Sequence, residues 1–173
     1  MAKPIVSENL IIVNGDGKCT TPEQVIVLLC ERLAREGYVG PSYAQHVLER
    51  EKRFPTALPT LPYATAIPHA DARCVKETGV AVAVLGKPVP FRAMESPDDY
   101  LHVRVVLLLA VAQATQQTSM LQWVCEVLNQ QELVAQLASA KSPKAVMTVL
   151  DGLLERQEQG VEEDVRHRES CPS

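Results

Sequence analysis

Two almost uninterrupted apolar segments constrain the fold of this chain more than any other feature. Residues 78–85 carry no charge, and residues 101–112 carry a single one, at Arg104. A strand that is apolar on both faces is buried on both sides, which is typical of the centre of a sheet covered by helices. The length and the leucine and alanine content of the second segment also allow a buried helix, and that alternative stays open at this point.

Helical patterns precede and follow these two segments. Thr21-Pro22-Glu23-Gln24 has the composition of a capping box with proline at the first helical position, and Gly37 is expected to end the helix it begins. A second helix is predicted after Gly40-Pro41-Ser42, and Pro55 stops it. Apolar residues at helical spacing predict three further helices, over residues 120–128, 132–138 and 141–153.

Shorter strands complete the expected sheet. We predict them over residues 8–13, over Ala64–Ile67 and, after a turn at Gly86-Lys87-Pro88, over Val89–Phe91 as an edge segment. Residues 56–63 are expected to form an ordered loop. This order predicts an α/β fold with a mixed central β-sheet flanked by helices. Residues 6–153 are expected to form one domain, and the polar residues 154–173 a disordered tail.

Composition narrows the class of function. The 173 residues carry a formal charge of −4, and no basic cluster with interleaved aromatic residues is present, so we expect no nucleic-acid partner. No apolar run is long enough to span a bilayer, and the N-terminus lacks the apolar core of a secretion signal. These features predict a cytoplasmic protein.

One histidine follows a proline at the end of a predicted strand, in Ala66-Ile67-Pro68-His69. Proline has no N–H and a fixed φ, so the sheet ladder should stop there and leave His69 on a rigid corner, supported from behind and open in front. Reactive side chains are commonly held on such loops. The alternative is a histidine that ends the strand and bonds a nearby carbonyl group.

No other histidine or cysteine pattern points to a metal or a nucleotide. His46, His102 and His167 lack the spacing of a recognised metal site, and the sequence contains no Walker loop, G-x-G-x-x-G or G-x-S-x-G motif. We therefore expect no metal and no cofactor.

The chemistry open to His69 is nucleophilic. A neutral imidazole is a good nucleophile near neutral pH, and a phosphoryl group on it would need cationic or N–H donors around its oxygens. Arg50 and Arg53 could supply charge if the second helix ends beside the strand, and Thr56 could donate a hydroxyl. The alternatives are local ion pairs between the arginines and neighbouring glutamates, and a threonine that only caps the loop.

A carrier that docks two partners in turn should also have an apolar rim. Ala57, Leu58, Leu61 and Tyr63 are candidates for this rim, and the alternative is that they pack the loop inward.

These motifs together resemble the enzyme IIA domains of the fructose–mannitol type in the bacterial phosphoenolpyruvate-dependent sugar phosphotransferase system. The likeness covers residues 6–153 and depends most on Ala66-Ile67-Pro68-His69, which matches the phosphorylation motif of that family. Three further stretches fall where the family places them. They are Gly37-Tyr38-Val39 with the helix that ends Leu48-Glu49-Arg50-Glu51, Pro55-Thr56, and Pro88-Val89-Pro90-Phe91 with the long apolar strand.

The resemblance implies a phosphotransferase function. His69 would accept phosphate at Nε2 from the histidine-containing phosphocarrier protein, with Nδ1 oriented by a backbone carbonyl group, and pass it to a cysteine of enzyme IIB. Enzyme IIB would then phosphorylate a sugar that enters through the membrane enzyme IIC. Arg50 matches the arginine that the family places near its active histidine.

One departure bears on the branch within the family. Mannitol-type members carry a second histidine near the start of the helix after the long strand, whereas this sequence has Gln116-Gln117 there. The galactitol-type branch also lacks that histidine, so the resemblance favours a galactitol-like member. The alternative is the nitrogen-related regulatory branch, which has the same transfer chemistry but acts through phosphorylation-dependent protein binding.

Overall fold

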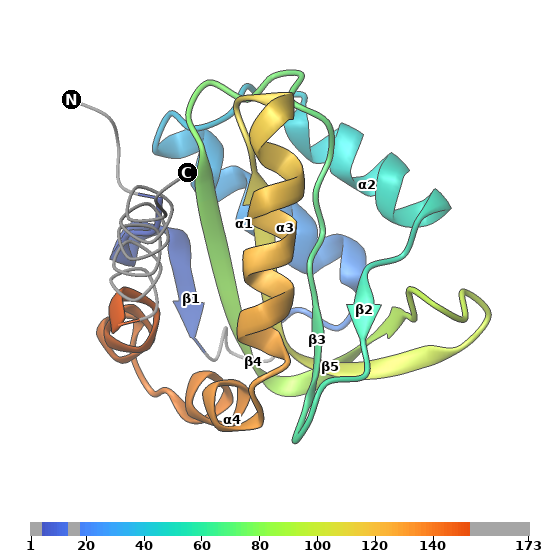
Figure 1. The fold of residues 1–173 in the computed structure, drawn as a ribbon. Coiled ribbons are helices and arrows are strands. Elements are labelled where there is room, and N and C mark those ends of the chain that lie inside the picture. The colour runs from blue at the N-terminus through green and yellow to red at the C-terminus, as the bar shows by residue number, and fades with distance from the viewer. Residues whose placement is uncertain (1–4, 14–17, 153–173) are drawn as a thin grey trace, which may run out of the picture.

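The computed structural model describes residues 5–13 and 18–152 and shows a mixed five-stranded sheet with helices on both faces (Figure 1). The strands lie in the order β1-β4-β5-β3-β2, with β4–β5 and β2–β3 antiparallel and β1–β4 and β3–β5 parallel. The expected α/β fold with a mixed sheet is confirmed. The strands are β1 (Ile11–Val13), β2 (Ala57–Leu58), β3 (Ala64–Ala66), β4 (Gly79–Arg92) and β5 (Tyr100–Ala110).

The first two helices begin and end close to their sequence signals, whereas the helix predicted over residues 120–128 begins earlier, at Ala114. Thr21 and Gln24 form the expected capping box, in which Thr21 Oγ1 accepts from the Gln24 N–H at 3.3 Å and Gln24 Oε1 accepts from the Thr21 N–H at 3.3 Å. Gly37 follows the first helix at φ 78°, a conformation that glycine adopts without strain. The helices are α1 (Pro22–Arg35), α2 (Tyr43–Arg53), α3 (Ala114–Leu128) and α4 (Gln131–Ser139), and residues 143–152 are also helical.

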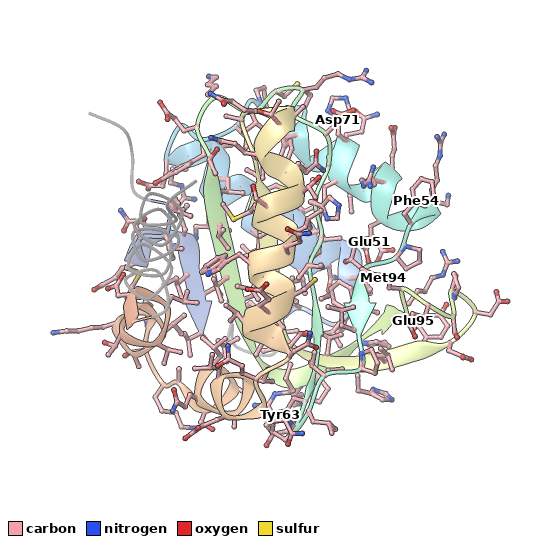
Figure 2. The ribbon with its side chains drawn as sticks, viewed as in Figure 1. Glu51, Phe54, Tyr63, Asp71, Met94 and Glu95 are labelled. Atoms are coloured by element: carbon pink, nitrogen blue, oxygen red, sulfur yellow. The ribbon has the colours of Figure 1, made fainter. Side chains whose placement is uncertain are left out.

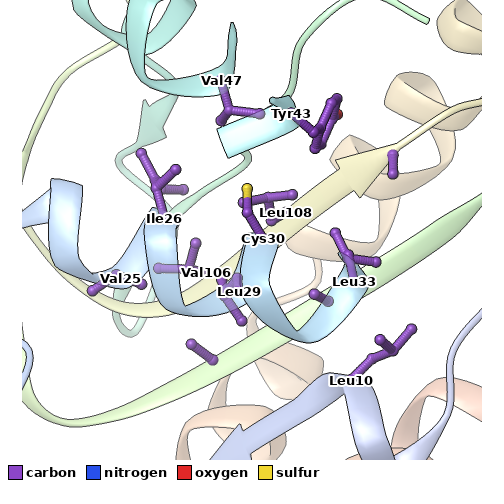
Figure 3. Packing of buried hydrophobic residues seen from close by; sticks show 14 of the residues in the cluster. Leu10, Val25, Ile26, Leu29, Cys30, Leu33, Tyr43, Val47, Val106 and Leu108 are labelled. Atoms are coloured by element: carbon purple, nitrogen blue, oxygen red, sulfur yellow. The ribbon is translucent and has the colours of Figure 1, made fainter. Parts of the chain in front are cut away.

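The two apolar segments are the central strands β4 and β5, so the helical alternative for residues 101–112 is wrong. Their side chains alternate between two separate cores because successive residues of a strand point to opposite faces. On β5, Val106 and Leu108 pack with α1 and α2 in one core (Figure 3), whereas Val105 and Leu107 pack with α3 and α4 in the other. Because both faces of the sheet are buried, these strands have apolar residues on both faces and show no alternation of polar and apolar residues.

The strands differ from the sequence predictions in three places. The chain does not turn at Gly86-Lys87-Pro88, because β4 continues to Arg92 through a bulge between Val84 and Val89 that keeps both halves paired with β5. Within the predicted loop, residues 57–58 form β2 and pair with β3. The first predicted strand is divided into a 3-10 turn over Glu8–Leu10 and β1.

Within residues 5–13 and 18–152, no helix is both long enough and apolar enough to cross a lipid bilayer. The predicted tail over residues 154–173 lies outside the described residues.

Candidate functional site

His69 lies where β3 ends beside the C-terminal end of β5. The Leu109 N–H donates to the Pro68 carbonyl at 3.0 Å, and His69 forms an isolated parallel bridge with Leu109. On the other side, the Ile67 N–H donates to the Thr56 carbonyl at 3.3 Å. The corner is therefore held on both sides by backbone bonds, and Pro68 itself needs no donor partner because it has no N–H.

The ring of His69 is oriented by its own backbone. Nδ1 lies 2.8 Å from the carbonyl oxygen of Ile67, as the family resemblance implied. Because a carbonyl oxygen can only accept, the neutral ring carries its hydrogen on Nδ1 and has its lone pair on Nε2. The nitrogen with the lone pair is thus the one that is not bonded to the Ile67 carbonyl.

The expectation that His69 is open in front needs correction, because its exposed fraction is only 8%. Pro68 and Ala70 on either side of it are buried as well, since the corner packs against the end of β5. Among the described residues, the enclosed side-chain atoms without a hydrogen-bond partner are His46 Nδ1 and Arg50 Nε, and His69 Nε2 is not one of them. The reactive edge therefore reaches solvent through a small opening.

Burial also sets the charge of His69. Loss of solvation lowers the pKa of the imidazole below its ordinary 6.5, and the Arg50 guanidinium lowers it further, while the bond to Ile67 acts in the opposite direction. A lowered pKa keeps the ring neutral at pH 7, which is the form with a free lone pair.

Arg50 is placed near His69 by the last turn of α2. Its guanidinium carbon lies 5.5 Å from the centre of the exposed Phe54 ring, a cation–π arrangement. The alternative, in which Arg50 and Arg53 pair with neighbouring glutamates, is not seen within the described residues, where the ion pair of this region joins Arg73 to Asp71 at 3.3 Å. Both guanidinium groups are therefore available to another acceptor.

A pocket of about 310 Å³ lies between α2 and the segment after His69. Its walls bring together three guanidinium groups, the imidazole of His46 and two carboxyl groups, and one of these carboxyl groups, Asp71, is already paired with Arg73. Figure 2 shows Asp71 near the upper end of α2 and Phe54 near its other end. The lining residues are His46, Glu49, Arg50, Arg53, Phe54, Ala70, Asp71 and Arg73. Such a pocket is suited to an oxyanion, because arginine donors match phosphate oxygens in charge and geometry.

A larger pocket, of about 650 Å³, contains no residue of the His69 corner. It lies among α1, α2 and β4 and is lined largely by apolar atoms from residues such as Ile26, Leu48 and Pro90. His69 itself lines neither pocket, but the smaller one contains Ala70 and Asp71, which directly follow it, and is therefore the candidate pocket.

Thr56 is buried, and its hydroxyl has a partner. Thr56 Oγ1 donates to Glu51 Oε2 at 2.8 Å, and the Thr56 N–H donates to Glu51 Oε1 at 3.1 Å. The hydroxyl hydrogen is thus directed at a carboxylate of α2 in this structure. A role for Thr56 in binding a phosphoryl group stays a prediction.

Tyr43, the first residue of α2, was not among the predicted site residues, but its hydroxyl supports the candidate site. The hydroxyl donates to the Leu109 carbonyl at 2.7 Å and accepts from the Ala70 N–H at 3.4 Å. Arg73 and Phe54 were also missed. Their sequence signal was proximity along the chain, since Arg73 follows His69 by four residues and Phe54 follows Arg50 by four.

The predicted apolar rim is not at the site. Ala57 is fully buried, and Leu58 packs against the core formed with α3 and α4. Leu61 and Tyr63 are exposed, but Tyr63 lies at the opposite end of the molecule from Asp71 (Figure 2), with its ring 4.9 Å from the guanidinium of Arg104. The exposed apolar side chain beside the pocket is instead Phe54.

Comparison with known proteins shows which family the chain is similar to. The family model described as "Phosphoenolpyruvate-dependent sugar phosphotransferase system, EIIA 2" matches residues 4–152. The chain is 30% identical over 141 residues to the 2-O-alpha-mannosyl-D-glycerate-specific EIIABC component of Escherichia coli K12, covering 79% of this chain and 20% of that protein. It thus spans about a fifth of the length of that relative.

Two shorter relatives are matched over most of their length. The galactitol-specific EIIA component of Escherichia coli K12 is 28% identical over 129 residues, which cover 75% of this chain and 85% of that protein. A solution structure of enzyme IIAMTL with phosphorylated enzyme IIBMTL from Escherichia coli is 28% identical, covers 85% of this chain and 97% of that one, and superimposes with a TM-score of 0.70. The match to the family model over nearly all of the described residues, with the same fold, means that this chain belongs to the EIIA 2 family of the phosphoenolpyruvate-dependent sugar phosphotransferase system.

Proposed function

We propose that His69 carries a phosphoryl group from the histidine-containing phosphocarrier protein to a cysteine of enzyme IIB. The observation that carries this proposal is the bond of 2.8 Å between Nδ1 and the Ile67 carbonyl, which leaves the lone pair on Nε2. The lowered pKa of the ring supports it, because a neutral imidazole is the attacking form.

In the first step, Nε2 of His69 attacks the phosphorus atom, a new P–N bond forms, and the P–N bond to the donor histidine breaks with its electron pair returning to that ring. In the second step, the thiolate of enzyme IIB attacks the phosphorus atom and the electron pair of the breaking bond returns to Nε2. The hydrogen stays on Nδ1 throughout and is donated to the Ile67 carbonyl, and this hydrogen bond strengthens as the phosphorylated ring becomes more positive.

Arg50 would stabilise the charge that spreads over the phosphoryl oxygens during both steps. Its effect on the pKa of His69 indicates that the two groups lie within electrostatic reach. Phosphoryl transfer depends mainly on such positioned charge, because the transition state concentrates negative charge on the oxygens. Thr56 remains a candidate for the same site.

A galactitol-like sugar alcohol is the proposed end acceptor, reached through enzyme IIB and the membrane enzyme IIC. The relative specific for galactitol and the Gln116-Gln117 pair, which stands where mannitol-type members have a second histidine, support this assignment. Gln116 and Gln117 lie in the first turn of α3, which begins four residues after β5. The proposal places the transfer in the cytoplasm and assigns it to a domain of residues 6–153.

The test is phosphorylation with phosphoenolpyruvate, enzyme I and the phosphocarrier protein. Wild type should take up one acid-labile phosphate, His69→Gln should take up none, and the control His102→Gln, at an exposed position of β5, should behave as wild type. Equal incorporation into wild type and His69→Gln would contradict the assignment.

The choice of acceptor separates transport from regulation. Phosphorylated protein should pass its phosphate to the enzyme IIB of a galactitol system and release unphosphorylated His69. If it passes phosphate to no enzyme IIB but binds another protein only in one phosphorylation state, the regulatory alternative takes the place of the transport role.

A further inference from the structure

Glu51 is the carboxylate of α2 that does not line the candidate pocket: it borders the larger pocket, and both of its oxygens are bonded to Thr56. It follows Arg50 directly, so the two side chains leave the last turn of the helix in different directions, and Figure 2 shows Glu51 at this end of α2, close to the start of β2. Both carboxylate oxygens of Glu51 accept bonds from Thr56, one from its N–H and one from its hydroxyl. A bidentate contact of this kind fixes the position of Thr56 relative to the helix.

The contact continues to the imidazole through three further groups. The Thr56 carbonyl accepts from the Ile67 N–H at 3.3 Å, and the Ile67 carbonyl binds His69 Nδ1 at 2.8 Å. Thr56 is 2% exposed and Ile67 1%, so this path is shielded from water. The Ile67 carbonyl, which selects the tautomer of His69, is therefore connected to Glu51 through the backbone bond between Ile67 and Thr56.

We propose that Glu51 is a positioning residue for phosphoryl transfer, which holds the His69 ring in its reactive tautomer and orientation through Thr56 and Ile67 without touching the phosphoryl group. This inference rests on the proposed function of His69. The last turn of α2 then has two roles. Arg50 provides positive charge for the phosphoryl oxygens, and Glu51 fixes the position of the segment that supports His69.

The burial of Glu51 fits this role. Loss of solvation raises the pKa of its carboxyl group, and the bonds from Thr56 and the charge of Arg92 act in the opposite direction. The two bonds from Thr56 offset the cost of removing the carboxylate from water, because a buried acceptor without partners is destabilising.

The experiment compares Glu51→Ala with Glu51→Gln. Alanine removes both acceptors, whereas the amide of glutamine can accept from the Thr56 N–H and donate to the Thr56 hydroxyl oxygen, so it should restore the clamp. The matched control is Glu126→Ala, which removes an exposed carboxylate from α3. Two readouts are needed: the initial rate of phosphorylation of His69, and the ¹⁵N chemical shifts of its ring, which report the tautomer without any phosphate.

We expect Glu51→Ala to lower kcat/KM for phosphorylation by about tenfold or more, since a small displacement of a reacting group is costly. Its ring shifts should move from a single Nδ1–H tautomer towards a mixture. Glu51→Gln and Glu126→Ala should stay close to wild type in both readouts. A folded Glu51→Ala protein with an unchanged tautomer and rate would overturn the inference and leave Glu51 a purely structural residue.

A second pair covers the case in which Glu51→Ala does not fold. Thr56→Val removes only the hydroxyl donor, while Thr56→Ser retains it, so valine should shift the tautomer and serine should not. The same shifts in both variants would overturn the inference. If wild type takes up no phosphate, the proposed function fails, yet the tautomer measurement still decides whether Glu51 orients the ring.

Discussion

A neutral imidazole is the form of His69 that can attack phosphorus, and its surroundings favour that form. Burial and the charge of Arg50 both disfavour the imidazolium, so the folded protein protonates His69 less readily than the unfolded chain does. Between the lowered pKa and 6.5, the unfolded state holds more protons. The contribution of His69 to the free energy of unfolding therefore decreases as the pH falls through that window and is fully regained above 6.5.

We predict that Arg50→Gln raises the pKa of His69 towards 6.5. The substitution removes the positive charge that disfavours the imidazolium, while the effect of burial remains. The same variant should lose about a hundredfold in phosphorylation rate, the usual effect of removing one donor to a developing oxyanion. NMR titration of the ring and initial rates at pH 7 measure the two effects. Arg35→Gln, at an exposed arginine of α1, is the control. A pKa that stays the same or falls would contradict the assigned influence of Arg50.

At the scale of elements, the site depends on how α2 is fastened to the end of β5. Tyr43 opens α2 and is fully buried between that helix and the sheet. Its hydroxyl connects the Leu109 carbonyl at the end of β5 with the Ala70 N–H just after His69. Burial raises the pKa of this phenol, so it remains a neutral donor. One side chain therefore sets the distance between the helix that carries Arg50 and the strand that supports His69.

Tyr43→Phe should therefore destabilise the protein by about 1–3 kcal/mol, because it leaves a buried carbonyl group without this donor. For a domain of this size that corresponds to a decrease in Tm of about 2–10 °C. Thermal unfolding followed by circular dichroism measures it. Tyr100→Phe removes a hydroxyl from a tyrosine that is 62% exposed and should change Tm little. Equal effects of the two substitutions would show that the hydroxyl contacts of Tyr43 contribute nothing.

At the scale of the whole molecule, the pocket opens on one end of the sheet, and a carrier must bring that end against two partners in turn. The candidate contact on this face is Phe54, whose ring is 62% exposed although it lies beside Arg50. Exposed aromatic residues next to an arginine are typical of the centres of protein interfaces. Tyr100 has the same exposed fraction, 62%, but lines the larger pocket instead.

Phe54→Ser should raise the KM for the phosphorylated carrier about tenfold, which corresponds to about 1.4 kcal/mol of binding free energy. Phe54→Tyr, which keeps the ring, should restore it, and Tyr100→Ser should have no effect. Steady-state rates of phosphate transfer at several carrier concentrations measure the change. A similar loss in Tyr100→Ser would mean that docking is not centred on the pocket.

Much of the fold was predictable because it follows from short stretches of sequence. The capping box of Thr21 and Gln24 is a local feature and occurs in the structure as predicted. The strand before His69 ends at Ala66, close to the proline, although His69 itself still pairs with Leu109. The central position of β5 followed from a strand without a polar face. These signals depend on periodicity and on backbone chemistry, which act over a few residues.

What the sequence determined by itself is the set of elements, the layers they form, and the one histidine placed on a rigid corner. Only the tertiary structure decided that the corner is nearly closed, that Glu51 rather than a phosphate takes the hydroxyl of Thr56, and that Arg73 meets Arg50 across one pocket. It also showed that β4 continues through a bulge between Val84 and Val89, where a turn was expected. The physical reason is that exposure and hydrogen-bond partners depend on how α2, β3 and β5 pack, and packing brings together residues that no local pattern relates.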